Sequence, residues 1–176
     1  MTTDSELKKL AEDGKLAFEA GNYESAADTF ENAAKGYASL NDPLNEAEMK
    51  NNMSVALLKL GKAQQALDVV TGTDTVFAQA KDLKRQGMAV GNQASALEAL
   101  KRFDEALDAY ERSAQIFADA HEGDLRSMVL KSAAAIKLKR GKVSDSAVKM
   151  IGSLEAKAKP SIFDRILRFF IRLVVR

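Results

Sequence analysis

The chain has 176 residues, 46% of them apolar and 29% charged, which is the length and balance of one globular domain. Since it contains no cysteine, disulfides, thiolate nucleophiles and thiolate metal ligands are excluded, and we expect a reducing, cytoplasmic environment. The net charge is only +1, and no basic patch interleaved with aromatic residues is present, so we expect no nucleic-acid partner.

In chain order, apolar spacing and helix-ending residues predict helices almost throughout. The start lacks a basic and an apolar stretch, which predicts no signal peptide. Boundaries between consecutive helices are expected at Gly21, Pro43 and Gly123. The threonine-rich run 71–75 predicts a kink or a short break. The expected helices lie at about 5–20, 23–40, 43–60, from 63 onward, 83–100, 103–120, 124–139, 144–157 and 162–175.

One turn recurs every 40 residues, and so do the residues around it. The turns are Gly21-Asn22-Tyr23, Gly61-Lys62-Ala63, Lys101-Arg102-Phe103 and Gly141-Lys142-Val143. Two rows of small residues have this period: Gly14, Ser54, Ala94 and Ala134, and Ala26, Ala66, Ala106 and Ser146. A third row holds mostly large residues: Phe30, Val70, Tyr110 and Met150. A fourth, aromatic row is Tyr37, Phe77 and Phe117. One helix pair cannot bury all these stripes, so neighbouring pairs must stack.

The small residue, turn, aromatic and alanine between Ala94 and Tyr110 resemble the tetratricopeptide repeat, in a long-helix form with a period of 40 instead of 34. The resemblance implies an all-α fold, an α–α superhelix of about four helix hairpins. Residues 1–159 would form the repeat domain, with repeats at about 5–42, 43–82, 83–122 and 123–159, and residues 160–176 a C-terminal basic amphipathic helix.

The resemblance also implies a concave groove lined by the first helix of each pair. Asn52 and Asn92 are equivalent by repeat, and their amides could hold an extended peptide backbone, or instead be solvated or bridge adjacent helices. The expected groove residues are Lys8, Lys15, Phe18, Asn51, Asn52, Val55, Met88, Asn92, Ser95, Met128 and Lys131. The carboxylate clamp of chaperone-binding relatives is not carried over, since of its expected residue types only Asn52 is kept.

The tail after Pro160 combines a wide apolar face with positive charge. The apolar residues are Ile162, Phe163, Ile166, Leu167, Phe169, Phe170, Leu173 and Val174, and the arginines that would contact anionic lipid are Arg165, Arg168, Arg172 and Arg176. This helix could cap the repeats, lie on a membrane surface, or pair with another protein, including a second copy. At about 24 Å it is too short for about 30 Å of hydrocarbon.

No phosphate-binding loop, nucleophile motif or metal-ligand spacing is present, so we expect no enzyme, cofactor or metal. The sequence therefore predicts a non-catalytic adaptor that binds a peptide or helix in its groove, with the tail as an intramolecular cap. The alternatives are an adaptor anchored at a membrane surface by its tail and a chaperone or self-associating assembly protein.

Overall fold

The structure is a computed structural model that describes the backbone of residues 3–155 and the side chains of residues 3–141. Every element in this part of the chain is an α-helix, which confirms the predicted all-α class. The chain divides into two units, 1–133 and 134–176. The helices are α1 (Asp4–Glu19), α2 (Tyr23–Ser39), α3 (Pro43–Lys59), α4 (Ala63–Val70), α5 (Thr73–Gln79), α6 (Leu83–Ala99), α7 (Phe103–Asp119) and α8 (Gly123–Glu155).

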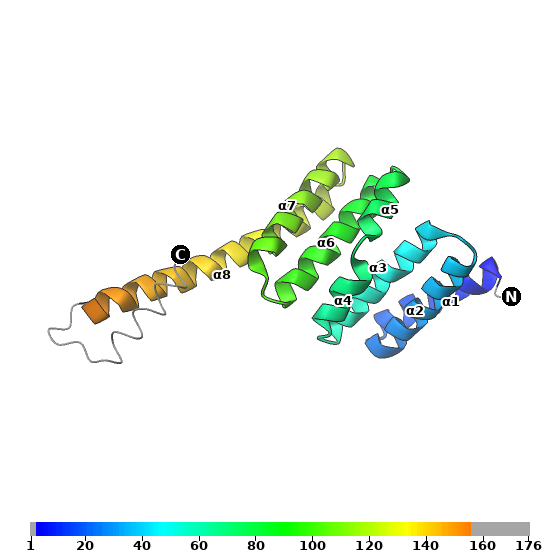
Figure 1. Ribbon diagram of the computed structural model, residues 1–176, viewed down its shortest axis with the longest axis horizontal. Coiled ribbons are helices and arrows are strands. Elements are labelled where there is room, and N and C mark those ends of the chain that lie inside the picture. The colour runs from blue at the N-terminus through cyan, green and yellow to red at the C-terminus, as the bar shows by residue number, and fades with distance from the viewer. Residues whose placement is uncertain (1–2, 156–176) are drawn as a thin grey trace. The chain divides into compact units, whose positions relative to one another are not determined.

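Within the first unit, consecutive helices form antiparallel hairpins that stack in chain order (Figure 1). The first hairpin is α1 with α2, the second is α3 with α4 and α5, and the third is α6 with α7. Neighbouring hairpins touch through α2 with α3 and through α3, α4 and α5 with α6. The predicted helix hairpins are thus confirmed for three repeats.

Apart from the junction between α4 and α5, six turns join the eight helices, and all six have the same backbone form. The second residue after each helix has a positive φ, between 55° and 79°, and these residues follow one another every 20 positions: Gly21, Asn41, Gly61, Lys81, Lys101 and His121. The next amide then donates to the carbonyl five residues back, at 2.9–3.0 Å, which satisfies the open carbonyls of the helix end.

Turns that lead from one hairpin to the next carry an acidic cap. The Asp42 carboxylate accepts from the amide of Asn45 at 3.1 Å, and the Asp82 carboxylate accepts from the amide of Arg85 at 2.9 Å. This backbone hydrogen bond, together with the Arg85 guanidinium, holds the pKa of Asp82 below its usual value. The turns inside hairpins, at Asn22, Lys62 and Arg102, have no side-chain cap bond.

Glycines allow the two helices of a hairpin to approach closely. A methyl group on Gly14 would come within 2.7 Å of the Phe30 ring, and one on Gly87 within 2.7 Å of the Phe117 ring. The predicted small-residue rows are buried in all three hairpins, and so are the predicted rows that contain Phe30 and Phe117. Small residues opposite large ones therefore set the spacing of the hairpins, as the repeat pattern predicts.

The predicted break in the second hairpin is present. Helix α4 ends at Val70, Gly72 has a φ of 86°, and α5 restarts at Thr73. The Thr71 and Thr73 hydroxyls donate to the carbonyls of Leu67 and Val70 at 2.7 and 2.8 Å. These hydroxyls compete with the backbone amides for the helical carbonyls, which explains why the helix is interrupted here.

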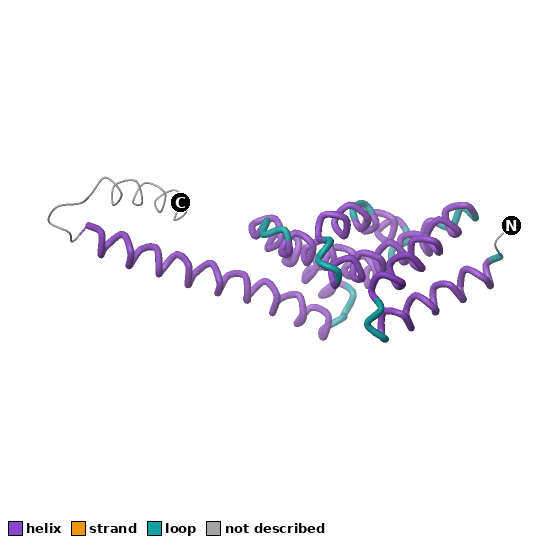
Figure 2. Tube along the Cα trace, turned by 90° about the horizontal axis from the view of Figure 1, so that it is seen from below, coloured by secondary structure: helices purple, strands orange, loops and turns teal. Residues whose placement is uncertain are grey.

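The turn predicted at Gly141-Lys142-Val143 is absent from the described part of the chain. Helix α8 continues past Gly141 to Glu155 as one helix of 33 residues, and Gly141 has no positive φ (Figure 2). One glycine weakens a helix by only about 1 kcal/mol, so it does not by itself force a turn. In the three hairpins the second helix also buries an aromatic residue near its end, at Tyr37, Phe77 or Phe117, whereas the equivalent residue here is Lys157. The predicted tail helix at 160–176 lies outside the described residues.

Candidate functional site

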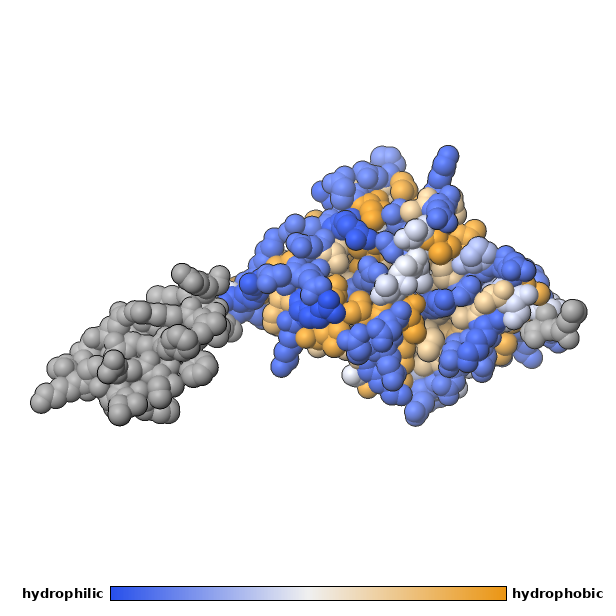
Figure 3. Space-filling view, viewed as in Figure 1, coloured by the Kyte–Doolittle hydropathy of each residue, from blue (hydrophilic) through white to orange (hydrophobic). Residues whose placement is uncertain are grey.

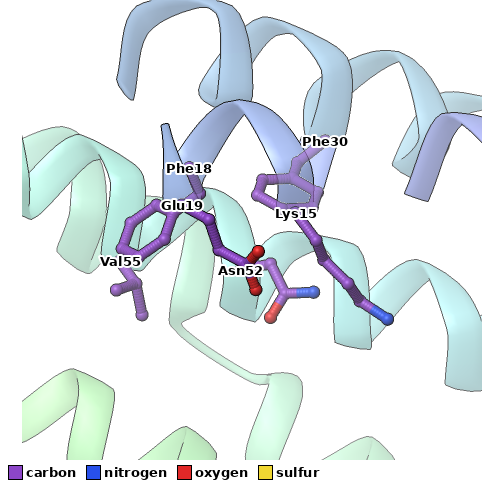
Figure 4. A pocket seen from close by; sticks show the side chains of 6 residues that line it. All are labelled: Lys15, Phe18, Glu19, Phe30, Asn52 and Val55. Carbon is purple, nitrogen blue, oxygen red and sulfur yellow. The ribbon is translucent and has the colours of Figure 1, made fainter. Parts of the chain in front are cut away.

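Two apolar hollows lie on the side of the repeats formed by the first helix of each hairpin. The first hollow has a volume of about 160 Å³ and lies between α1 and α3, with α2 behind it (Figure 4). Phe18 and Phe30 supply its aromatic walls, and Val55 adds an aliphatic one. Lys15, Glu19 and Asn52 complete its lining. The Phe18 ring is held by edge-to-face packing against Tyr23, with centroids 5.2 Å apart.

The second hollow has a volume of about 220 Å³ and lies between α6 and the start of α8, with α7 behind it. Its apolar lining includes Met88 and Met128, which are 43% and 58% exposed. The full lining is Met88, Gly91, Asn92, Ser95, Tyr110, Phe117, Leu125, Met128, Val129 and Ser132. All these residues belong to the first unit of the chain.

The floor of the second hollow carries a buried phenol. The Tyr110 hydroxyl donates to the Glu98 carboxylate at 2.9 Å and lies 3.2 Å from the Ser95 hydroxyl. Burial raises the pKa of Tyr110, and the neighbouring Glu98 carboxylate adds to the rise. The phenol therefore stays protonated at neutral pH and presents a neutral polar group within apolar walls.

A polar bridge between α3 and α6 separates the two hollows. The Asn92 amide donates to the side-chain oxygen of Asn51 at 3.2 Å, and the Asn51 amide donates to the carbonyl of Ala47 at 3.2 Å and reaches the Thr73 hydroxyl at 3.4 Å. Nearby, the Arg85 guanidinium pairs with the Glu48 carboxylate at 3.0 Å. Figure 3 shows that hydrophilic and apolar residues are interspersed on the face of the repeats that is turned to the viewer.

The structure brings together eight of the eleven predicted groove residues, four in each hollow. Lys15, Phe18, Asn52 and Val55 line the first, and Met88, Asn92, Ser95 and Met128 line the second. Equivalent by repeat, Asn52 and Asn92 lie in different hollows, and Asn92 bridges adjacent helices. Pattern reasoning missed several contributors from the second helices, above all Phe30 and Tyr110, which the core rows already contained.

Three predicted groove residues lie elsewhere. Asn51 is only 7% exposed and belongs to the polar bridge, because its position is equivalent to the buried Ala11 and Gly91. Lys8 is exposed on α1, where it pairs with Asp4 at 2.6 Å. Lys131 is exposed on α8 and lines neither hollow.

The described part of the chain has neither the side-chain clusters of a metal site nor a membrane-spanning helix. No group of three or more histidine, aspartate or glutamate side chains there is placed to hold a metal ion. None of the helices in the same part of the chain combines the length and apolar character needed to cross a membrane. The residues predicted for a cap or a lipid contact, from Ile162 to Arg176, lie outside it.

No protein-family model matches this chain, and no curated protein matches it in sequence.

Proposed function

We propose that the chain is a repeat protein of the tetratricopeptide type that acts as a non-catalytic adaptor and binds a linear peptide. The observation that carries this proposal is the pair of hollows on the first-helix face, each lined by apolar side chains together with an amide. An extended peptide laid across this face would place apolar side chains in the hollows and its backbone against Asn52 and Ser95.

The size of the hollows favours peptide side chains over a free small molecule or cofactor. Pockets for such ligands usually measure about 300–1,000 Å³. At about 160 and 220 Å³, each hollow is smaller than that range and better suited to one large side chain of a longer ligand. The two methionines at the mouth of the second hollow can adapt to side chains of different shape.

Selection of linear peptides from a random displayed library against the full chain tests this proposal. We expect enrichment of peptides with spaced aromatic or aliphatic residues. Met88→Lys should weaken their binding by about tenfold or more, which is about 1.4 kcal/mol, because it places an unpaired charge at the mouth of the hollow. Leu16→Lys is the matched control, since Leu16 is 54% exposed and lines neither hollow. Equal weakening by both variants, or no enrichment, would refute the proposal.

Positive charge and three phenylalanines in the tail support the second candidate function, an adaptor anchored at a membrane surface. Co-sedimentation of the full chain and of residues 1–160 with vesicles of anionic lipid separates this candidate from an intramolecular cap. Lipid binding that is lost on truncation supports the anchor. A truncated chain that melts earlier, with no lipid binding by the full chain, supports the cap.

A further inference from the structure

Helix α8 has a face that the repeat pattern marks for burial but that is exposed. Positions 7, 11 and 14 of the first hairpin and their equivalents in the second and third are buried, because the second helix of each hairpin covers them. The equivalent residues of α8 are Ser127, Lys131 and Ala134, and all three are exposed. Leu130 and Leu138, 42% and 60% exposed, lie on the same face, which spans about 100° of the helix.

The sequence contains the helix that would cover this face. Ser146 and Met150 stand where the earlier hairpins have the buried pairs Ala26 with Phe30 and Ala106 with Tyr110. Because α8 runs unbroken to Glu155, this segment continues the same helix and cannot lie against it (Figure 2). The same segment of a second copy of the chain can lie against this face.

The hairpins also define the register of such a pair. In the first hairpin Gly14 faces Phe30, which centres the pairing on position 22. In the third, Gly87 faces Phe117 and Gly91 faces Ser113, which centres it on position 102. With a period of 40, the equivalent centre on α8 is position 142.

We propose that two copies of the chain associate through α8, antiparallel and symmetric about residue 142, so that residues 144–155 of each copy cover the exposed face of the other. Ala134 then lies opposite Met150 of the second copy, and Leu130 opposite Leu154. Each contact occurs twice, as in any two-fold interface, and the arrangement exchanges the missing hairpin helix between copies. No turn at Gly141 is required, since α8 runs unbroken in both copies.

Sedimentation equilibrium of the full chain gives the first test. We expect a reversible dimer with twice the 19.1 kDa mass of one chain. Ala134→Arg should weaken dimerisation by about tenfold or more, because it places a large, unpaired charge where the proposed register sets Ala134 opposite Met150. Ala135→Arg is the matched control: Ala135 is also exposed but lies 100° around the helix, so the dimer should persist. A monomeric parent chain, or equal loss in both variants, would overturn the proposal.

Engineered disulfides give the second test, in a chain that has no cysteine of its own. Ala134→Cys and Met150→Cys are made as separate variants, mixed and oxidised. We expect a covalent dimer from the mixture, and little from either variant alone, since identical positions lie about 24 Å apart in the proposed pair. A mixture that gives no covalent dimer contradicts the pairing. So does an internal disulfide in the double variant, which would show each chain folding its own segment back.

Discussion

The positive φ angles in the turns predict that adding a side chain at one turn lowers the stability of the fold, and that removing one at the equivalent turn raises it. Gly61 and Lys101 occupy the same turn of successive repeats, with φ angles of 73° and 61°. An L residue in this region is disfavoured by about 1–2 kcal/mol, and replacing glycine restricts the unfolded chain by about 0.4–1 kcal/mol in the other direction. Gly61→Ala should therefore destabilise the protein by about 1 kcal/mol, and Lys101→Gly should stabilise it by a similar amount.

Steric clashes do not contribute to the effect of Gly61→Ala, since nothing lies within 4 Å of a methyl group placed on Gly61. Thermal unfolding followed by far-ultraviolet circular dichroism measures both, and about 1 kcal/mol corresponds to a Tm shift of about 2–4 °C in a chain of this length. Gly141→Ala is the control, because Gly141 lies inside α8 with no positive φ and alanine should stabilise the helix there. A lower Tm for Lys101→Gly would refute the reasoning.

Three further predictions concern a cap, a buried amide and a close contact. Asp82→Ala should destabilise the fold by about 1 kcal/mol at pH 7. The pKa of Asp82 is depressed in the folded state, so the carboxylate stabilises the fold above its unfolded pKa. Urea titrations measure the free energy of unfolding of the parent and the variant. The difference between them should shrink below about pH 4, as the pH falls through the folded pKa of Asp82. Asn51→Ala should destabilise by about 1–3 kcal/mol, since it leaves buried partners unsatisfied, whereas Asn52→Ala should change the urea midpoint little. Gly87→Ala should lower Tm more than Gly91→Ala, because the added methyl meets an aromatic ring at 2.7 Å in the first case and a serine hydroxyl at 3.3 Å in the second.

The hairpins could be predicted because local and tertiary signals agree. Gly21 and Gly61 end helices by their own conformational freedom, and the buried aromatics Tyr37, Phe77 and Phe117 anchor each second helix. The break near Gly72 was predictable for the same reason, since threonine hydroxyls that compete with the helical ladder flank it.

The local sequence did not reveal that the turn of the fourth repeat would be absent. Gly141 has the right spacing, but a glycine permits a turn without requiring one. Whether the helix continues depends on what the following segment gains by packing, and the loss of the anchoring aromatic at Lys157 is the one sequence signal that argues against a hairpin.

Individual groove residues depended on contacts that periodicity does not report. Asn51 and Asn52 are neighbours of the same type, yet one is buried in a bridge between helices and the other lines a hollow. Alignment of Asn51 with Ala11 and Gly91 would have distinguished the two asparagines, because a position that holds alanine and glycine in the neighbouring repeats predicts burial.

The identical backbone path of the six turns has a consequence for how such a chain can change its length. Each turn reverses the chain in the same way, so the direction of the helices is restored every 40 residues, even across the interruption at Gly72. An in-frame deletion or duplication of 40 codons, joined at matching helix positions, therefore reconnects two complementary surfaces without designing a new junction. Gene-level rearrangement can thus lengthen or shorten this array by whole hairpins while the remaining ones keep their neighbours.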